Sequence, residues 1–250
     1  LLDIVRGLAA LKPHDLSMTT NGLSLHRQAA QLRDAGVDRL TISWDSMQPQ
    51  RLARITGSAF ATDPPNLQYD RGMKILDQLQ AGIAAAIAAG FEKLKINTVV
   101  IGNVNDDEVA DFARLTIENN WTVRFIEYMP LGESQLTGNY DQTPSTVDNA
   151  LVIERIQNVF GQLESVDRQS EAGVGPAQLY SLHHAAGRLG FISAMSQPFC
   201  ETCNRLRMTA KGELRACLFD GGEVDVIPAL RPKVDPKKLI ELMEQCVVEK

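Results

Sequence analysis

Residues 71–101 read RGMKILDQLQAGIAAAIAAGFEKLKINTVVI and combine a helix, a stop signal and a strand. The first part carries an apolar stripe at helical spacing, made of Met73, Leu76, Leu79, Ile83 and Ile87. Gly90 ends this helix, since glycine readily adopts the left-handed conformation at a helix C-terminus. Residues 93–101 then form a largely apolar strand. Short connections between helices and strands predict right-handed βαβ units and a parallel sheet.

The same alternation extends outward from this unit. We expect strands at residues 15–19, 39–44 and 122–128, and helices at residues 1–11, 25–35 and 106–119. Gly36 would end the second of these helices, and Asp106 or Asp107 would cap the third. The predicted fold class is therefore α/β, with an open or barrel-like parallel sheet.

The pattern changes after about residue 130. Residues 131–149 are polar and rich in turn formers, and a helix is expected at 151–160. Strands are then expected at 178–183, 188–194, 206–209 and 213–218, the last two joined through Lys211-Gly212. We therefore expect two domains, at residues 1–130 and 131–250.

Composition narrows the class of protein. The 250 residues carry a formal net charge of −6, which argues against a nucleic-acid coat or a general membrane-surface binder. The longest apolar stretch, residues 83–89, is too short to span a bilayer. Most of the four cysteines cluster in one motif, which is typical of metal binding in a reducing compartment rather than of a secreted disulfide framework.

Three cysteines form the strongest chemical signal in the chain: Cys200, Cys203 and Cys217. Their spacing fits a metal site that lacks one protein ligand. They could be unligated buried thiols, or a zinc site completed by His183 or His184. They could also hold a [4Fe–4S] cluster with three protein ligands and one open iron, which fits the missing ligand best. Cys246 lies far along the chain in an amphipathic helix and is expected to pack as a small apolar residue.

Basic residues beside this motif suggest an anionic ligand. Arg205 and Arg207 are two positions apart in an extended segment, so they share one face, and paired guanidinium groups suit a phosphate chain. A solvated strand face is the alternative.

Polar residues also interrupt apolar strands of the first half. Lys95 and Asn97 lie in a strand that a parallel sheet would cover on both faces, so a ligand is one explanation for them. Otherwise Lys95 begins an edge strand and extends to solvent. Arg124 raises the same question, and it could simply pair with Glu127 or Asp45.

Six segments carry a resemblance to a known family: LSMTTNG at 16–22, TISWDS at 41–46, KINTVV at 95–100, NDDE at 105–108, RFIEYMP at 124–130, and residues 199–219. Their order and spacing resemble the GTP 3′,8-cyclases of molybdenum-cofactor biosynthesis, which are radical S-adenosylmethionine (SAM) enzymes. The resemblance implies an incomplete (β/α) barrel of the radical SAM type, followed by a C-terminal β-rich [4Fe–4S] region. It implies the cyclisation of GTP to 3′,8-cyclo-7,8-dihydroguanosine triphosphate, the first step of molybdopterin biosynthesis.

The resemblance also assigns roles to residues and cofactors. Contacts with GTP would come from Thr19, Lys95, Arg205, Leu206 and Arg207, and contacts with SAM from Ser43 and Met129. Asn97 and Arg124 are further candidates. The C-terminal [4Fe–4S] cluster would have the ligands Cys200, Cys203 and Cys217, and its open iron would hold the guanine ring. A second [4Fe–4S] cluster, expected in an N-terminal region that these residues lack, would bind and cleave SAM.

The chain departs from the family pattern at its ends. The Cys-x-x-x-Cys-x-x-Cys motif of the SAM cluster, the Gly-Gly-Glu-Pro segment and the double-glycine tail do not occur in these residues. We expect a fragment truncated at both ends, which supplies GTP binding and the auxiliary cluster and is inactive alone. Its N-terminus carries no information on organelle targeting.

Several partners follow from the resemblance. They are GTP, SAM, an electron donor, and cyclic pyranopterin monophosphate synthase as the next enzyme, with room for a homodimer and no nucleic acid or membrane. A bacterial-type cytoplasmic location is expected. The alternative function is a non-catalytic zinc- or cluster-binding module that holds a nucleotide or a partner protein.

Overall fold

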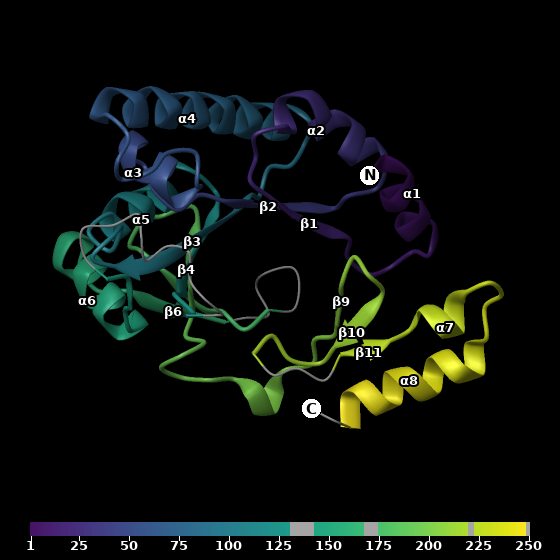
Figure 1. Ribbon diagram of the computed structural model, residues 1–250. Helices are drawn as coiled ribbons and strands as arrows, with labels where there is room; N and C mark the ends of the chain where they lie inside the picture. The colour runs from purple at the N-terminus through teal and green to yellow at the C-terminus, as the bar shows by residue number, and fades with distance from the viewer. Residues whose placement is uncertain (131–142, 168–174, 220–222, 249–250) are drawn as a thin grey trace. The chain divides into compact units, whose positions relative to one another are not determined.

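The computed structural model describes residues 1–130, 143–167, 175–219 and 223–248 (Figure 1). The chain divides into two compact units, Leu1–Pro198 and Phe199–Lys250. The domain boundary expected near residue 130 differs from this division and stays a prediction. Most of the polar segment expected at residues 131–149 lies outside the described residues.

The first unit is built on a sheet of eight described strands that does not close into a barrel. In spatial order its main path is β1 Ser17–Thr20, β2 Arg39–Ser43, β3 Lys95–Gly102, β4 Thr122–Glu127, β8 Arg188–Ile192, β7 Gln178–Ser181 and β6 Glu164–Val166. The strands from β1 to β8 pair in parallel, while β7 and β6 are antiparallel additions. A short strand, β5 Ser145–Thr146, pairs with β3. The open parallel sheet agrees with the predicted α/β fold class.

The helices of this unit are α1 Leu2–Ala10, α2 Leu25–Asp34, α3 Pro49–Ile55, α4 Pro65–Ala88, α5 Val109–Glu118 and α6 Asn149–Phe160. Gly36 has φ of 105° and follows α2, as predicted. Helix α4 begins earlier than the expected residue 71, because Pro65 suits the first turn of a helix. The predicted cap of α5 is wrong: its N-cap is Glu108, without a side-chain cap bond. Helix α3 was not predicted.

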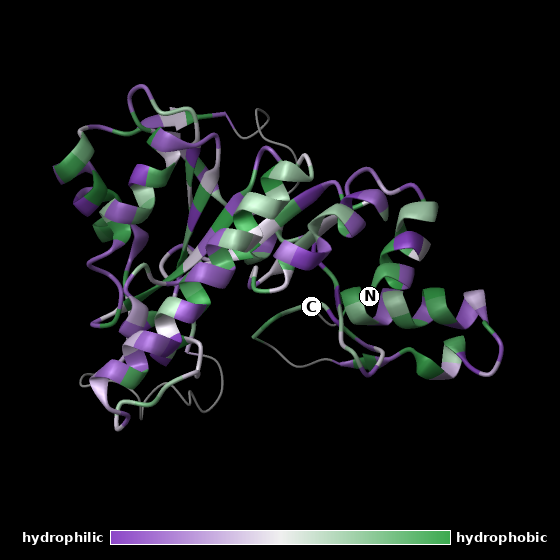
Figure 2. Ribbon diagram, turned by 90° about the horizontal axis from the view of Figure 1, so that it is seen from above, coloured by the Kyte–Doolittle hydropathy of each residue, from purple (hydrophilic) through white to green (hydrophobic). Residues whose placement is uncertain are grey.

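One face of the parallel sheet is apolar and forms the core with the helices. Its buried residues include Leu40, Ile42, Ile96, Val123, Phe125 and Leu189. Helices α2 and α4 contribute Leu32, Leu79 and Ile83 to the same cluster. The helices are accordingly amphipathic, with green and purple residues on the same ribbons in Figure 2. Within the described residues, no helix combines the length and apolar character needed to cross a membrane.

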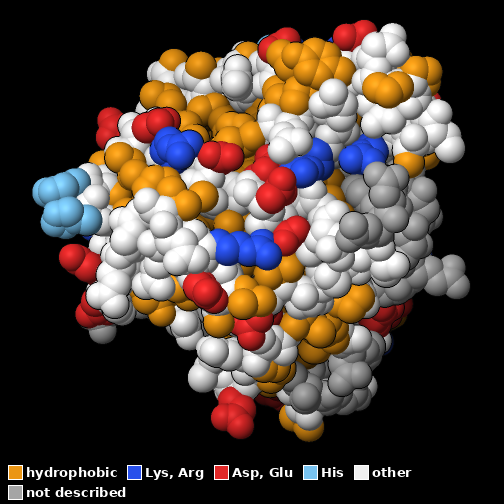
Figure 3. All heavy atoms as spheres, turned by 90° about the vertical axis from the view of Figure 1, so that its left-hand side faces the viewer, with side chains coloured by type: hydrophobic (Ala, Val, Ile, Leu, Met, Phe, Trp, Pro, Cys, Tyr) orange, Lys and Arg blue, Asp and Glu red, His pale blue; other side chains and the backbone are white. Residues whose placement is uncertain are grey.

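The surface near α3, α5 and α6 carries mixed charge. Figure 3 shows basic and acidic side chains lying beside one another on this face. Ion pairs of this kind join residues of the helices and of the turn before α5: Arg51 with Asp107 at 2.7 Å, Arg114 with Asp111 at 2.9 Å and Arg155 with Asp106 at 2.7 Å. The described residues of this face therefore place charges of both signs close together.

The second unit is small and carries the cysteine motif. Its elements are the short 3-10 helix η3 Cys200–Thr202, the strands β9 Arg207–Met208, β10 Glu213–Arg215 and β11 Val224–Asp225, and the helices α7 Ile227–Leu230 and α8 Pro236–Val248. Strands β9 and β10 form the predicted antiparallel hairpin. Cys246, a residue of α8, is 1% exposed and packs in the core of this unit, which confirms its packing role.

Candidate functional site

The face of the parallel sheet opposite the core is polar. Strand register pairs Thr19 with Thr41, Thr41 with Lys95, Ser43 with Asn97, and Asn97 with Arg124. Residues in register on neighbouring strands point to the same side of a sheet. The parallel register therefore gathers on one face five of the residues singled out in the sequence: Thr19, Ser43, Lys95, Asn97 and Arg124. Thr41 was missed, although it shares their alternation.

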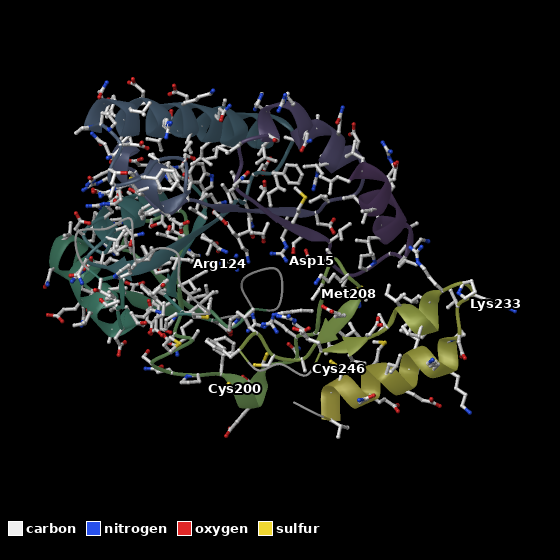
Figure 4. The ribbon with its side chains drawn as sticks, in the orientation of Figure 1. Asp15, Arg124, Cys200, Met208, Lys233 and Cys246 are labelled. Atoms are coloured by element: carbon white, nitrogen blue, oxygen red, sulfur yellow. The ribbon has the colours of Figure 1, made fainter. Side chains whose placement is uncertain are left out.

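Hydrogen bonds hold Arg124 across this face. Its Nε donates to Asn97 Oδ1 at 2.8 Å, and its Nη2 donates to Thr41 Oγ1 at 3.3 Å. Figure 4 places Arg124 on the side of the sheet turned away from α2 and α4. The alternative partners have other roles, because Glu127 projects toward the opposite face and Asp45 accepts a backbone hydrogen bond. Arg124 is therefore oriented by polar neighbours on the candidate face.

Lys95 lies at the start of β3 and is 9% exposed. Because β3 is a central strand between β2 and β4, the edge-strand explanation for Lys95 is wrong. Arg39 Nε donates to Asp15 Oδ1 at 2.6 Å. This bond lowers the pKa of the Asp15 carboxyl group, and the charges of Arg39 and Lys95 lower it further. Lys95 thus belongs to a charged group of residues at one end of the polar face.

Gly190 of β8 provides space for Arg124, its register partner on β4. A β-carbon at residue 190 would lie 3.0 Å from Arg124 Cγ, which is tighter than nine in ten real contacts of a β-carbon. The glycine therefore lets the arginine side chain lie along the sheet. Sequence reasoning missed this residue because only the pairing of β4 with β8 brings the two together.

Buried carboxylates fix the strand ends that carry the proposed SAM-binding residues. Asp45, two residues after Ser43, accepts a hydrogen bond from the Val99 backbone N–H at 2.8 Å. Burial raises the pKa of the Asp45 carboxyl group, although this hydrogen bond opposes the change.

Near Met129, Glu127 is fully buried at the end of β4. It accepts backbone hydrogen bonds from Asn149 at 3.1 Å, Met195 at 2.8 Å and Ser196 at 2.9 Å.

The second unit holds the three candidate ligands in two short segments. Cys200 is exposed at the start of η3, Cys203 follows that helix, and Cys217 lies half-buried two residues after β10. These thiols fit a three-thiolate cluster site in donor type and sequence order. Among the described residues, no three His, Cys, Asp or Glu side chains are grouped so as to hold a metal ion, and the histidines proposed as zinc ligands belong to the first unit.

The arginines after the cysteine pair share a face, as predicted. Arg205 and Arg207 are half-buried, whereas the intervening Leu206 is 41% exposed. The guanidinium carbon of Arg205 lies 5.1 Å from the centre of the Phe199 ring, a cation–π distance. In register with Arg207 lies Arg215 of β10, which the sequence reasoning missed. The expected turn at Lys211-Gly212 would pair Arg207 with Ala216, whereas the observed register is shifted by one residue and pairs Arg207 with Arg215.

Comparisons with known proteins give mutually consistent matches along the chain. Residues 1–116 match the Radical SAM superfamily, and residues 121–250 match the family Molybdenum Cofactor Synthesis C. A protein named GTP 3′,8-cyclase from Microcystis aeruginosa is 39% identical over 99% of this chain and 70% of its own length. The chain belongs to the GTP 3′,8-cyclase family.

Other cyclases of the family give the same result. The GTP 3′,8-cyclase of Heliobacterium modesticaldum is 40% identical over 94% of this chain and 66% of its own length. That of Rippkaea orientalis is 39% identical over 98% of this chain and 68% of its own length. The chain thus spans about two thirds of the length of these cyclases.

Proposed function

We propose that this chain is the GTP-recognising and auxiliary-cluster part of a GTP 3′,8-cyclase that acts in molybdenum-cofactor biosynthesis. The observation that supports this most is the polar sheet face, where register alone gathers Lys95, Asn97 and Arg124. A parallel sheet normally covers both faces with apolar residues. Cationic and amide side chains on one face, opposite an apolar core, suit a charged polar ligand.

The first unit is proposed to contact GTP through Thr19, Lys95 and Arg124. The ammonium group of Lys95 and the guanidinium group of Arg124 supply positive charge for phosphate or ribose oxygens. Asn97 orients Arg124 through the bond to Nε. From the second unit, Arg205, Leu206 and Arg207 are proposed to contribute further contacts with GTP.

The cofactors are proposed to be SAM and [4Fe–4S] clusters. Ser43 and Met129 would contact SAM, and Cys200, Cys203 and Cys217 would ligate the auxiliary cluster, leaving one iron open for the guanine ring. When bound, SAM and its own cluster supply the radical that starts bond formation between C3′ and C8 of GTP, with electrons from an external donor. The residues of this chain bind and orient the nucleotide for that reaction.

The remaining partners are also proposals. The cyclised nucleotide would pass to cyclic pyranopterin monophosphate synthase, and the protein would act in the cytoplasm, where thiols and clusters stay reduced. A homodimer is compatible with this function.

The test uses the full-length protein reconstituted anaerobically with iron and sulfide. Incubation with SAM, a reductant and GTP is expected to yield the cyclised triphosphate, detected by mass spectrometry. Lys95→Ala is expected to abolish most of the product. Lys93→Ala is the matched control, because Lys93 is exposed and only two residues away. A colourless protein that binds one zinc ion, or equal activity of the two variants, would contradict the proposal.

A further inference from the structure

Two arginines face each other across the hairpin of the second unit. Arg207 of β9 and Arg215 of β10 are antiparallel register partners. Side chains in such positions have β-carbons about 5 Å apart, and like charges placed there destabilise the pair. The hairpin therefore holds two positive charges together at a cost, unless an anion lies between or beside them.

Both guanidinium groups have buried donors that lack acceptors. Arg207 Nη1 and Arg215 Nε are buried and find no hydrogen-bond partner among the described residues. A buried donor without a partner is rare and costly, so each such donor calls for an explanation. A ligand with several acceptor oxygens would satisfy both donors at once.

Nearby carboxylates supply acceptors for only some of these guanidinium donors. Glu223, just before β11, forms an ion pair with Arg215 through Nη2. Glu213 lies two residues from Arg215, but its carboxylate accepts a hydrogen bond from Thr209 Oγ1 at 3.1 Å. The Nε of Arg215 stays without a partner despite both acids.

The hairpin directs these arginines away from the core of the unit. On its other face, Leu214 pairs with Met208, and Leu214 is 5% exposed in the cluster beneath α8. Alternation along the chain places Arg205 on the same face as Arg207. Arg205, Arg207 and Arg215 therefore form a group of three arginines on one face, here called the arginine face.

We propose that Arg215 is a third phosphate-binding arginine, acting beside Arg207 on the triphosphate of the nucleotide. In the absence of nucleotide Glu223 neutralises Arg215, and a phosphate group takes its place. Phosphate suits the site because its oxygens accept bidentate hydrogen bonds from guanidinium groups and satisfy Nη1 of Arg207 and Nε of Arg215. This inference rests on the proposed function, since it assumes that the arginine face receives GTP.

The experiment measures binding of GTP, GDP and guanosine to the full-length reconstituted protein by calorimetry. Arg215→Ala is expected to weaken GTP binding about tenfold, the loss of one charged hydrogen-bonded contact, and to leave guanosine binding unchanged. Arg215→Lys is expected to recover part of the affinity. Lys233→Ala removes the same charge at the exposed turn between α7 and α8 (Figure 4) and is expected to bind GTP normally.

A second variant tests whether Glu223 and phosphate compete for Arg215. Glu223→Gln removes the acid that occupies Arg215 and is expected to tighten GTP binding several-fold. Weaker binding by this variant would overturn the competition between Glu223 and phosphate.

The outcomes separate this inference from the proposed function. Failure of the wild-type protein to bind GTP, or unchanged binding by Arg205→Ala, would contradict the proposed function. Normal GTP binding by Arg215→Ala, together with weakened binding by Arg205→Ala, would overturn only the role of Arg215. An equal loss for guanosine and GTP would also overturn it, because guanosine has no phosphate.

Discussion

Arg124 Nε donates a 2.8 Å hydrogen bond to Asn97 Oδ1, joining register partners on two adjacent parallel strands. The Asn97 amide orients the guanidinium group of Arg124 without neutralising its positive charge. A carboxylate in the same place would hold Arg124 equally well and would repel a phosphate.

Asn97→Ala is therefore expected to weaken GTP binding by the full-length protein several-fold, through loss of the orientation of Arg124. Calorimetric titration with GTP measures the effect. Asn66→Ala, at an exposed position near the start of α4, is the control and should bind normally. Asn97→Asp should weaken binding at least as much, and affinity equal to wild type in that variant would contradict the electrostatic argument.

Single substitutions can distinguish Cys217, a proposed cluster ligand, from the buried Cys246. Cys217→Ala is expected to remove the auxiliary cluster from the reconstituted full-length protein, which would lose about half of its iron and sulfide if two clusters are present. Cys246→Ala removes a thiol group of the same kind from the core of the second unit, and this variant should keep its iron. Chemical analysis of iron and sulfide checks both variants. Equal iron content in the two variants would exclude Cys217 as a ligand.

Asp45 is expected to make stability depend on pH in one direction. Burial raises the pKa of its carboxyl group in the folded protein. The contribution of the protonated group to stability is therefore complete below about pH 4, the unfolded pKa, and is lost as pH rises through the raised folded pKa. Asp45→Asn keeps an acceptor for the Val99 N–H and carries no charge.

The free energy of unfolding of Asp45→Asn, relative to wild type, should consequently increase between pH 4.5 and pH 8. Urea denaturation at the two pH values measures this. A difference between variant and wild type that is the same at both pH values would show that Asp45 does not titrate in this window. Asp45→Ala should cost about 1–3 kcal/mol at low pH, because the Val99 N–H loses its acceptor.

Glu127 is expected to be a stability determinant at the end of β4. Its carboxylate accepts hydrogen bonds from backbone groups of α6 and of the loop after β8. Glu127→Gln places amide hydrogens against some of these donors and should lower the free energy of unfolding by about 2–3 kcal/mol. Glu118→Gln, at an exposed position of α5, should change it little. Equal denaturation midpoints for the two variants would refute this role.

The parallel sheet and its helices could be predicted because their signals are local. The stripe from Met73 to Ile87 and the stop at Gly90 depend only on residues a few positions apart. The beginning of α4 was placed too late because apolar periodicity is weak between Pro65 and Arg71, although the proline itself permits a helix start. Helix α3 is short, which leaves too few residues to establish a period.

Candidate site residues could be predicted where a polar or charged side chain interrupts an otherwise apolar strand. Lys95, Asn97 and Arg124 stood out in that way. Thr41 did not, since threonine is common in strands. Gly190 and Arg215 could be recognised only through their partners on other strands, and pairing between distant segments is not encoded in the spacing of nearby residues.

The space at Gly190 has a consequence for natural variation in this family. Residue 190 lies outside the segments that carry the family resemblance, yet a β-carbon there would crowd the side chain of Arg124. A variant at residue 190 would be classed as a change in the scaffold, although it would press on an arginine of another strand. Sequence surveys that score only the proposed ligand-contacting positions would therefore overlook this neighbour of Arg124.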